Sequence, residues 1–67
     1  MHVSVNGRLR PLEIPAPTIA SLVEAMALAG RRIAVELNGE IVPKSRYMAT
    51  RLADGDRVEI VGAVGGG

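Results

Sequence analysis

The stretch IAVELNGEIVP, residues 33–43, decides the fold of this sequence. Apolar residues alternate with small or polar ones over 33–37, which predicts a β-strand with one buried face. Asn38-Gly39 follows, and this pair favours a two-residue turn because both residues tolerate a positive φ. Residues 41–42 form a short return strand that Pro43 ends, because proline lacks the amide hydrogen a strand needs. The stretch therefore predicts a β-hairpin.

A second hairpin is predicted at the start of the sequence. Val3 and Val5 alternate with polar neighbours, and Asn6-Gly7 repeats the turn signal. Pro11 places the far strand at an edge of the sheet or marks a bulge. The two prolines of residues 15–17 end that strand. Its apolar residues are Leu9, Leu12 and Ile14.

A helix is predicted over residues 18–29. Thr18 is a favourable N-cap, because its hydroxyl can accept a hydrogen bond from a free amide of the first turn. Gly30 stands where a helix often ends in a left-handed conformation. The apolar residues between them have the i, i+3, i+4, i+7 spacing of one helical face and are Ile19, Leu22, Val23 and Met26.

The following segment leads to a last strand. Residues 45–52 predict a helical turn, and 54–56, with the sequence Asp-Gly-Asp, predict a tight turn. A strand follows over residues 57–61. The residues expected to reach the core from these segments are Tyr47, Met48, Leu52, Val58 and Ile60.

The predicted order is thus two strands, a helix, two strands, a short helix and a last strand. A hairpin followed by a helical crossover lets a later strand run parallel to the first. This predicts an α+β fold, a ubiquitin-like β-grasp roll, with a mixed sheet of four to five strands covered on one face by one main helix. The expected domain is 1–61, followed by a flexible C-terminal glycine tail over 62–67.

Composition excludes several classes of site. The chain has 67 residues, no cysteine, one histidine and a net charge of +1. Disulfides and thiolate metal sites are therefore excluded, and His2 cannot hold a metal alone. A balanced charge and the single aromatic Tyr47 argue against a nucleic-acid partner. Neither a signal peptide nor the roughly 18 apolar residues of a membrane helix is visible, so a cytoplasmic protein without membrane contact is expected.

The sequence does not assemble a catalytic centre. His2 is expected on an exposed strand, and no serine has a neighbouring histidine. The glycines do not match a phosphate-binding loop, since no GxxxxGK[ST] pattern occurs. Asp54 and Asp56 are better explained by hydrogen bonds within their turn than by calcium binding. We therefore expect a protein that is not itself an enzyme.

The unusual feature is the segment Gly62-Ala63-Val64-Gly65-Gly66-Gly67. Six extended residues reach roughly 20 Å, and glycine, which has no Cβ, can pass through a narrow channel. The unhindered carboxylate of Gly67 suits activation as an acyl-adenylate, which a thiol, a persulfide or an amine can attack. A frayed terminus without a function is the alternative that the glycines alone leave open.

The whole sequence resembles the ThiS family of thiamine-biosynthesis sulfur carriers. The resemblance rests on motifs at matching spacing rather than on any one of them. These motifs are Val5-Asn6-Gly7, Thr18-Ile19 with Leu22, the stretch 33–43, residues 52–61 with their Asp-Gly-Asp turn, and Val64-Gly65-Gly66-Gly67.

The resemblance implies a carrier acted on by partner enzymes. An E1-like adenylating enzyme would use ATP and magnesium to adenylate Gly67, and a cysteine desulfurase relay would convert it to a thiocarboxylate. Thiazole synthase would then take the sulfur. Gly67 would carry the reacting group, and Gly66, Gly65 and Val64 would contact the partners. The chain itself would bind no cofactor and no metal.

Other functions of the same pattern stay open at this point. The carrier could serve molybdopterin synthase or cysteine synthesis, act as a ubiquitin-like modifier of lysines, or be a binding module only. Small residues over 61–64 depart from the bulkier residue expected before the final Val-Gly-Gly, which affects partner affinity. A set of basic residues is expected to be a solvated surface: Arg31, Arg32, Lys44, Arg46 and Arg51.

Overall fold

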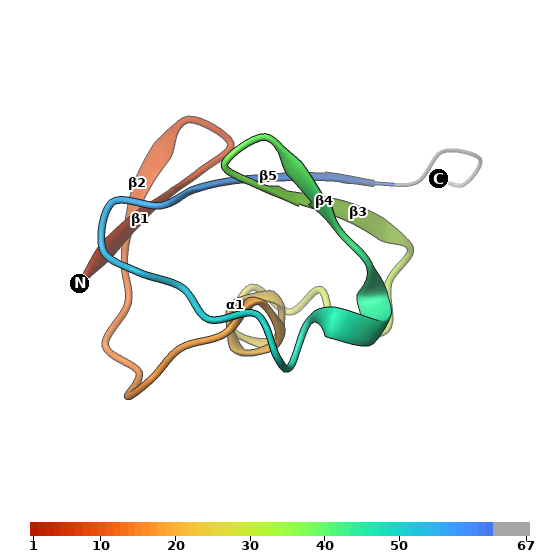
Figure 1. Ribbon diagram of the computed structural model, residues 1–67, viewed down its shortest axis with the longest axis horizontal. Helices are drawn as coiled ribbons and strands as arrows, with labels where there is room; N and C mark the ends of the chain where they lie inside the picture. The colour runs from red at the N-terminus through yellow and green to blue at the C-terminus, as the bar shows by residue number, and fades with distance from the viewer. Residues whose placement is uncertain (63–67) are drawn as a thin grey trace.

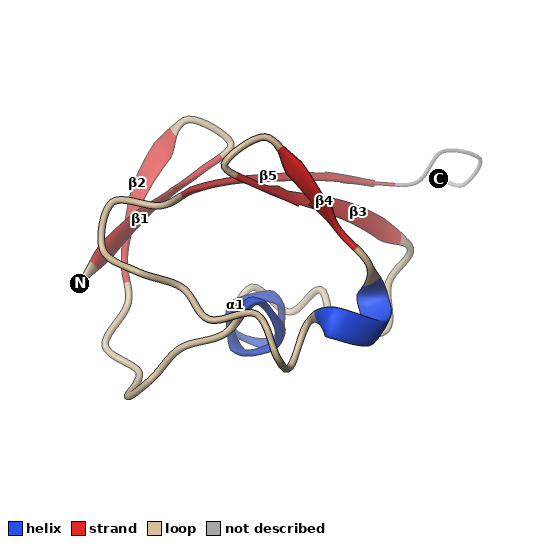
Figure 2. Cartoon of the chain, viewed as in Figure 1, coloured by secondary structure: helices blue, strands red, loops and turns tan. Residues whose placement is uncertain are grey.

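The computed structural model describes residues 1–62 as one mixed five-stranded sheet packed on a helix (Figure 1). The strands follow the spatial order β2-β1-β5-β3-β4. Both helical elements lie on the same side of the sheet, so no other element of residues 1–62 covers the opposite face, called here the uncovered face (Figure 2). The elements are β1 (His2–Val5), β2 (Arg8–Pro11), α1 (Ile19–Ala25), β3 (Ile33–Leu37), β4 (Glu40–Val42), the 3-10 helix η1 (Lys44–Arg46) and β5 (Arg57–Gly62).

The last strand occupies the centre of the sheet. β5 pairs in parallel with β1, through Ser4↔Arg57 and Val5↔Val58, and antiparallel with β3. The two hairpins, β1-β2 and β3-β4, place β2 and β4 at the edges. Pro11 lies on edge strand β2, as its missing amide hydrogen predicts. The predicted β-grasp arrangement is confirmed.

The core lies between the sheet and α1. Its most deeply buried side chains come from the helix and from three strands, and they are Ile19, Leu22, Val3, Val35 and Val58. On β1, β3 and β5, apolar residues on the inner side alternate with outward-facing ones, so one sheet face is buried and the other is open to solvent. Burying a side chain of this size contributes about 1.5–3 kcal/mol, so these contacts dominate the stability of the fold.

Helix α1 is shorter than predicted. Thr18 is its N-cap, as expected, but the helix ends at Ala25 rather than at residue 29. The reason is Ala27, which takes the left-handed conformation at φ 59°. The Ala27 amide donates to the Glu24 carbonyl, and the Leu28 amide donates to the Val23 carbonyl. This pair of hydrogen bonds is a Schellman motif with alanine in the usual glycine position.

No helix within residues 1–62 is long and apolar enough to cross a membrane.

Three further predictions need correction. β2 ends at Pro11 rather than at Ile14, although Leu12 is buried just after it. Met48 is 82% exposed rather than in the core, because η1 makes a single turn that directs Tyr47 inward. β5 extends one residue beyond the predicted strand, since Gly62 pairs with Ile33.

Candidate functional site

The candidate site is the end of β5 together with the surfaces around it. The four residues predicted to act, Val64, Gly65, Gly66 and Gly67, lie outside the described residues 1–62. What the structure describes is the strand that leads to them. β5 is flanked on both sides by other strands, and Gly62 at its end is paired with the first residue of β3. The path toward the glycines therefore begins at a fixed point of the sheet.

The side chain of Asn6 holds the second half of β5. β1 ends at Val5, so its parallel pairing with β5 would stop at Val58. Asn6 continues it, because its side-chain amide donates to the Ile60 carbonyl at 2.9 Å while its Oδ1 accepts from the Ile60 amide at 2.7 Å. One side chain thus satisfies both backbone groups of a central-strand residue, two residues before Gly62.

The other end of β5 is held by Asn38 and the predicted tight turn. Asn38 Oδ1 accepts from the Arg57 amide at 2.9 Å, and its Nδ2 donates to Asp56 Oδ1 at 3.1 Å. The second oxygen of Asp56 accepts from the Ala53 amide at 2.8 Å. Asp54 Oδ1 accepts from the His2 amide at 2.8 Å. Asp56 therefore bonds within the turn, as predicted, whereas the Asp54 side chain bonds the start of β1 instead; Gly55 provides the positive φ of 89°.

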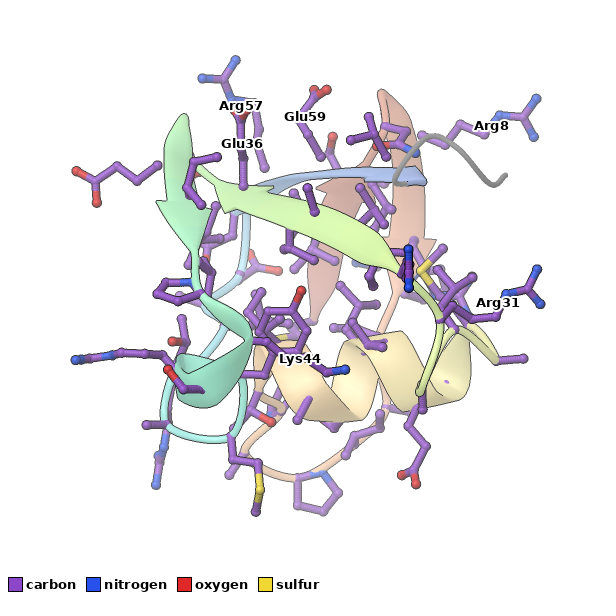
Figure 3. All side chains as sticks on the ribbon, turned by 90° about the vertical axis from the view of Figure 1, so that its right-hand side faces the viewer. Arg8, Arg31, Glu36, Lys44, Arg57 and Glu59 are labelled. Atoms are coloured by element: carbon purple, nitrogen blue, oxygen red, sulfur yellow. The ribbon has the colours of Figure 1, made fainter. Side chains whose placement is uncertain are left out.

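The uncovered sheet face combines exposed apolar side chains with carboxylates. Glu36 on β3 and Glu59 on β5 are direct cross-strand partners, and Arg57 projects from the same face (Figure 3). Like charges in this position repel each other and lower the stability of the isolated protein. The large apolar residues on this face are each more than half exposed, and they are Leu9, Ile41 and Val61.

Within residues 1–62, no group of three or more His, Cys, Asp or Glu side chains could hold a metal ion. His2 is exposed, and the Ser21 hydroxyl belongs to the capping box of α1, where it accepts from the Thr18 amide at 2.7 Å. Burial raises the pKa of the Tyr47 hydroxyl, so this group is a neutral donor rather than a base at neutral pH.

Sequence reasoning missed two features of this site. Asn6 and Asn38 were predicted only as turn residues, and nothing near them in the chain indicates that their side chains bond β5. The pairing of Glu36 with Glu59 depends on the register between β3 and β5, two strands that no tight turn connects. Neither feature has a local signal, because both arise from contacts between distant segments.

Comparison with known proteins places the chain in one family. The model of the ThiS family matches residues 3–67. The chain is 37% identical to the sulfur carrier protein ThiS of Bacillus subtilis, an alignment that covers 97% of this chain and 98% of that protein. The structure is similar to the crystal structure of the thiamine biosynthesis protein (ThiS) from Geobacter metallireducens, with a TM-score of 0.85, 33% identity and complete coverage of both chains.

A longer relative shows a different arrangement. All 67 residues of this chain align with a thiazole synthase of Paramagnetospirillum magneticum at 40% identity. The aligned part is only 20% of that protein. A segment similar to this chain is therefore part of a larger protein in that organism. With the family model, a full-length relative and a solved structure in agreement, the chain belongs to the ThiS family, the sulfur carriers of thiamine biosynthesis.

Proposed function

We propose that this carrier holds its sulfur as a thiocarboxylate on Gly67 and delivers it for the thiazole ring of thiamine. The observation that supports this most directly is the family match, which includes the glycines at residues 65–67. The central position of β5 adds to it, because its pairing with β3 up to Gly62 holds the strand that leads to these glycines. The absence of cysteine in the chain leaves the carboxylate as the group to carry sulfur.

The proposed chemistry has two stages, both catalysed by other proteins. An E1-like enzyme with ATP and magnesium joins the Gly67 carboxylate to AMP and releases pyrophosphate. A persulfide supplied by a cysteine desulfurase then attacks the acyl carbon and expels AMP, and a thiol releases the thiocarboxylate from the resulting acyl disulfide. Activation is needed because a free carboxylate is a poor electrophile. The cytoplasm, where ATP is available, is the proposed compartment.

In this proposal the chain supplies position and recognition rather than catalysis. Val64, Gly65 and Gly66 would pass through the narrow entrance of each partner, which residues without bulky side chains allow. The uncovered sheet face, with Leu9, Ile41 and Val61, would dock the adenylating enzyme. Thiazole synthase is the proposed sulfur acceptor, since a relative of that name contains a segment similar to this whole chain.

Intact-protein mass spectrometry tests the proposal. The chain is incubated with its adenylating enzyme, cysteine desulfurase, cysteine, ATP and magnesium. We expect the mass to rise by the difference between one sulfur and one oxygen atom, and the change to require ATP. A chain that lacks Gly67 should keep its fold, because the described sheet and core use residues up to Gly62 only, and should gain no sulfur. An unchanged mass with active partner enzymes would overturn the proposal, and linkage to lysines would show a modifier instead.

A further inference from the structure

Lys44 is the only lysine of the sequence, and all other members of its eight lysine and arginine residues are arginines. This matters for an activated carboxyl group, because an arginine guanidinium stays protonated in proteins, whereas a lysine amine that has lost its proton is a nucleophile. The one other amine is the amino group of Met1, which donates to the Leu12 carbonyl at 3.3 Å. Acylation within the chain therefore has two candidate sites.

The backbone of Lys44 lies beside the end of β5. Lys44 begins η1, two residues after Val42, which pairs with Val35 on β3. Two residues before Val35 is Ile33, which pairs with Gly62. The register thus brings Lys44 level with Ile33, and two strand spacings make its distance from Gly62 about 10 Å.

The side chain of Lys44 is accessible at this end of the molecule. Lys44 and Ile33 line the same pocket of about 230 Å³, between α1, η1 and β3. Lys44 is exposed, and no aspartate or glutamate from residues 1–62 lines the pocket beside it. Figure 3 views the molecule from the end at which β5 stops and shows Lys44 in front of α1. The amine therefore faces the side from which the chain leaves the sheet.

The amino group of Met1 lies at the opposite end of the sheet. β1 runs parallel to β5, so Met1 lies before the start of β5 and Gly62 at its end (Figure 1). Their separation along the sheet is about 26 Å, for about eight residues of extended chain at roughly 3.3 Å each. The residues 63–67 reach at most about 17 Å beyond Gly62. An acyl group on Gly67 therefore reaches the amine of Lys44 but not that of Met1.

We propose that Lys44 is a self-acylation site for activated Gly67. The proposal rests on the proposed function, because a free carboxylate does not react with an amine. The deprotonated Lys44 amine attacks the carbonyl carbon of the Gly67 acyl-adenylate, AMP leaves with the electron pair of the broken bond, and the nitrogen gives one proton to water. The product is an isopeptide loop over residues 44–67 of one chain, so it differs from conjugation to another protein. It has no carboxylate left at Gly67, so capture by sulfur competes with permanent loss of the carrier.

A chain whose Gly67 carboxyl group is prepared as a thioester tests the site without any partner enzyme. Attack by an amine expels the thiol, so loop formation is followed as a loss of the thiol mass, and fragmentation locates the new bond. Hydrolysis gives the heavier free acid and is counted separately. We expect the wild type to form the loop about tenfold or more faster than Lys44→Arg, at a rate that does not depend on protein concentration.

The matched control combines Lys44→Arg with Arg10→Lys, which keeps the composition and the charge. Arg10 pairs with Val3 on edge strand β2, toward the Met1 end of the sheet, so its lysine should react as slowly as Lys44→Arg alone. A two-dimensional NMR spectrum of each variant with a free carboxylate checks that the fold is kept.

Three outcomes would overturn the proposal. Equal rates in the wild type and Lys44→Arg would show that Lys44 is not the acceptor. An equally fast reaction of the control with Arg10→Lys would show that any lysine serves, whatever its position. A rate that rises with protein concentration would show that two molecules are joined instead. None of these results bears on thiocarboxylate formation, because the thioester replaces the enzymatic activation and mass spectrometry with the partner enzymes decides that step.

Discussion

The two Asn-Gly turns of this protein have almost the same backbone and different side-chain partners. Asn6 and Gly7 have φ values of 52° and 82°, and Asn38 and Gly39 have 51° and 88°. Each pair closes a two-residue hairpin, and each asparagine side chain bonds β5. The dipeptide alone therefore explains the turn, whereas the position of β5 explains the second task of each asparagine.

The two contacts differ in their surroundings. Asn6 bonds both backbone groups of Ile60 in a partly buried place. β1 ends at Val5 and does not pair with Ile60. Asn38 bonds the Arg57 amide and the Asp56 carboxylate in an exposed place, where water can replace the lost partner. A hydrogen bond removed from a buried group leaves that group unsatisfied, which costs more than the bond itself contributes. The comparison thus teaches that Asn6 matters more, although the turns look alike.

The largest effect is expected for Asn6→Gly. Glycine accepts the positive φ, so the variant removes the side chain without straining the turn. The amide and carbonyl of Ile60 lose their partners, and we expect the free energy of unfolding to fall by about 2–3 kcal/mol. Chemical denaturation followed by circular dichroism measures it.

Hydrogen exchange sharpens this prediction. The Ile60 amide should exchange faster in Asn6→Gly because it loses its partner. The exchange rate of the Val35 amide, on the β3 side, should change only as much as the global free energy of unfolding does. Asn6→Asp is the matched control, since it keeps an acceptor for the Ile60 amide, while it replaces the donor with a charged oxygen that faces the Ile60 carbonyl. A loss under about 0.5 kcal/mol in Asn6→Gly would show that water replaces the side chain.

A smaller effect is expected for Asn38→Gly. Its bonds to Arg57 and Asp56 are exposed, so both partners can be hydrated after the change. We expect a loss of about 1 kcal/mol, measured by the same denaturation experiment. Equal losses at Asn6 and Asn38 would remove the difference that burial predicts between the two turns.

The sequence predicted those parts of the fold that depend on near neighbours. Three such features depend only on residues close in the sequence, and all three were confirmed. They are the two Asn-Gly turns, the N-cap Thr18 and the alternating pattern over 33–37. The early end of α1 was not predictable in this way. Ala27 takes a conformation that glycine normally provides, and the Leu28 amide bonds back to the Val23 carbonyl there.

The candidate site, like the fold, was predicted from the sequence only in part. Residues 64–67 were named from composition and resemblance, and they remain a prediction because they lie outside the described residues. The pairing of Glu36 with Glu59 depends on how distant segments meet. A single sequence gives no register between strands that are far apart in the chain, so this pairing could be assigned only from the structure.

The smallest difference between the turns is expected at their glycines. Gly7→Ala and Gly39→Ala each force alanine into a left-handed conformation, and a Cβ at either position meets nothing within 4 Å. The loss therefore comes from the backbone alone and should be about 1 kcal/mol in each variant. Denaturation of both proteins under the same conditions should give free energies of unfolding within about 0.5 kcal/mol of each other. A clear difference would show that the turns differ in backbone strain, and burial around Asn6 and Asn38 would then not be the sole cause of the difference between them.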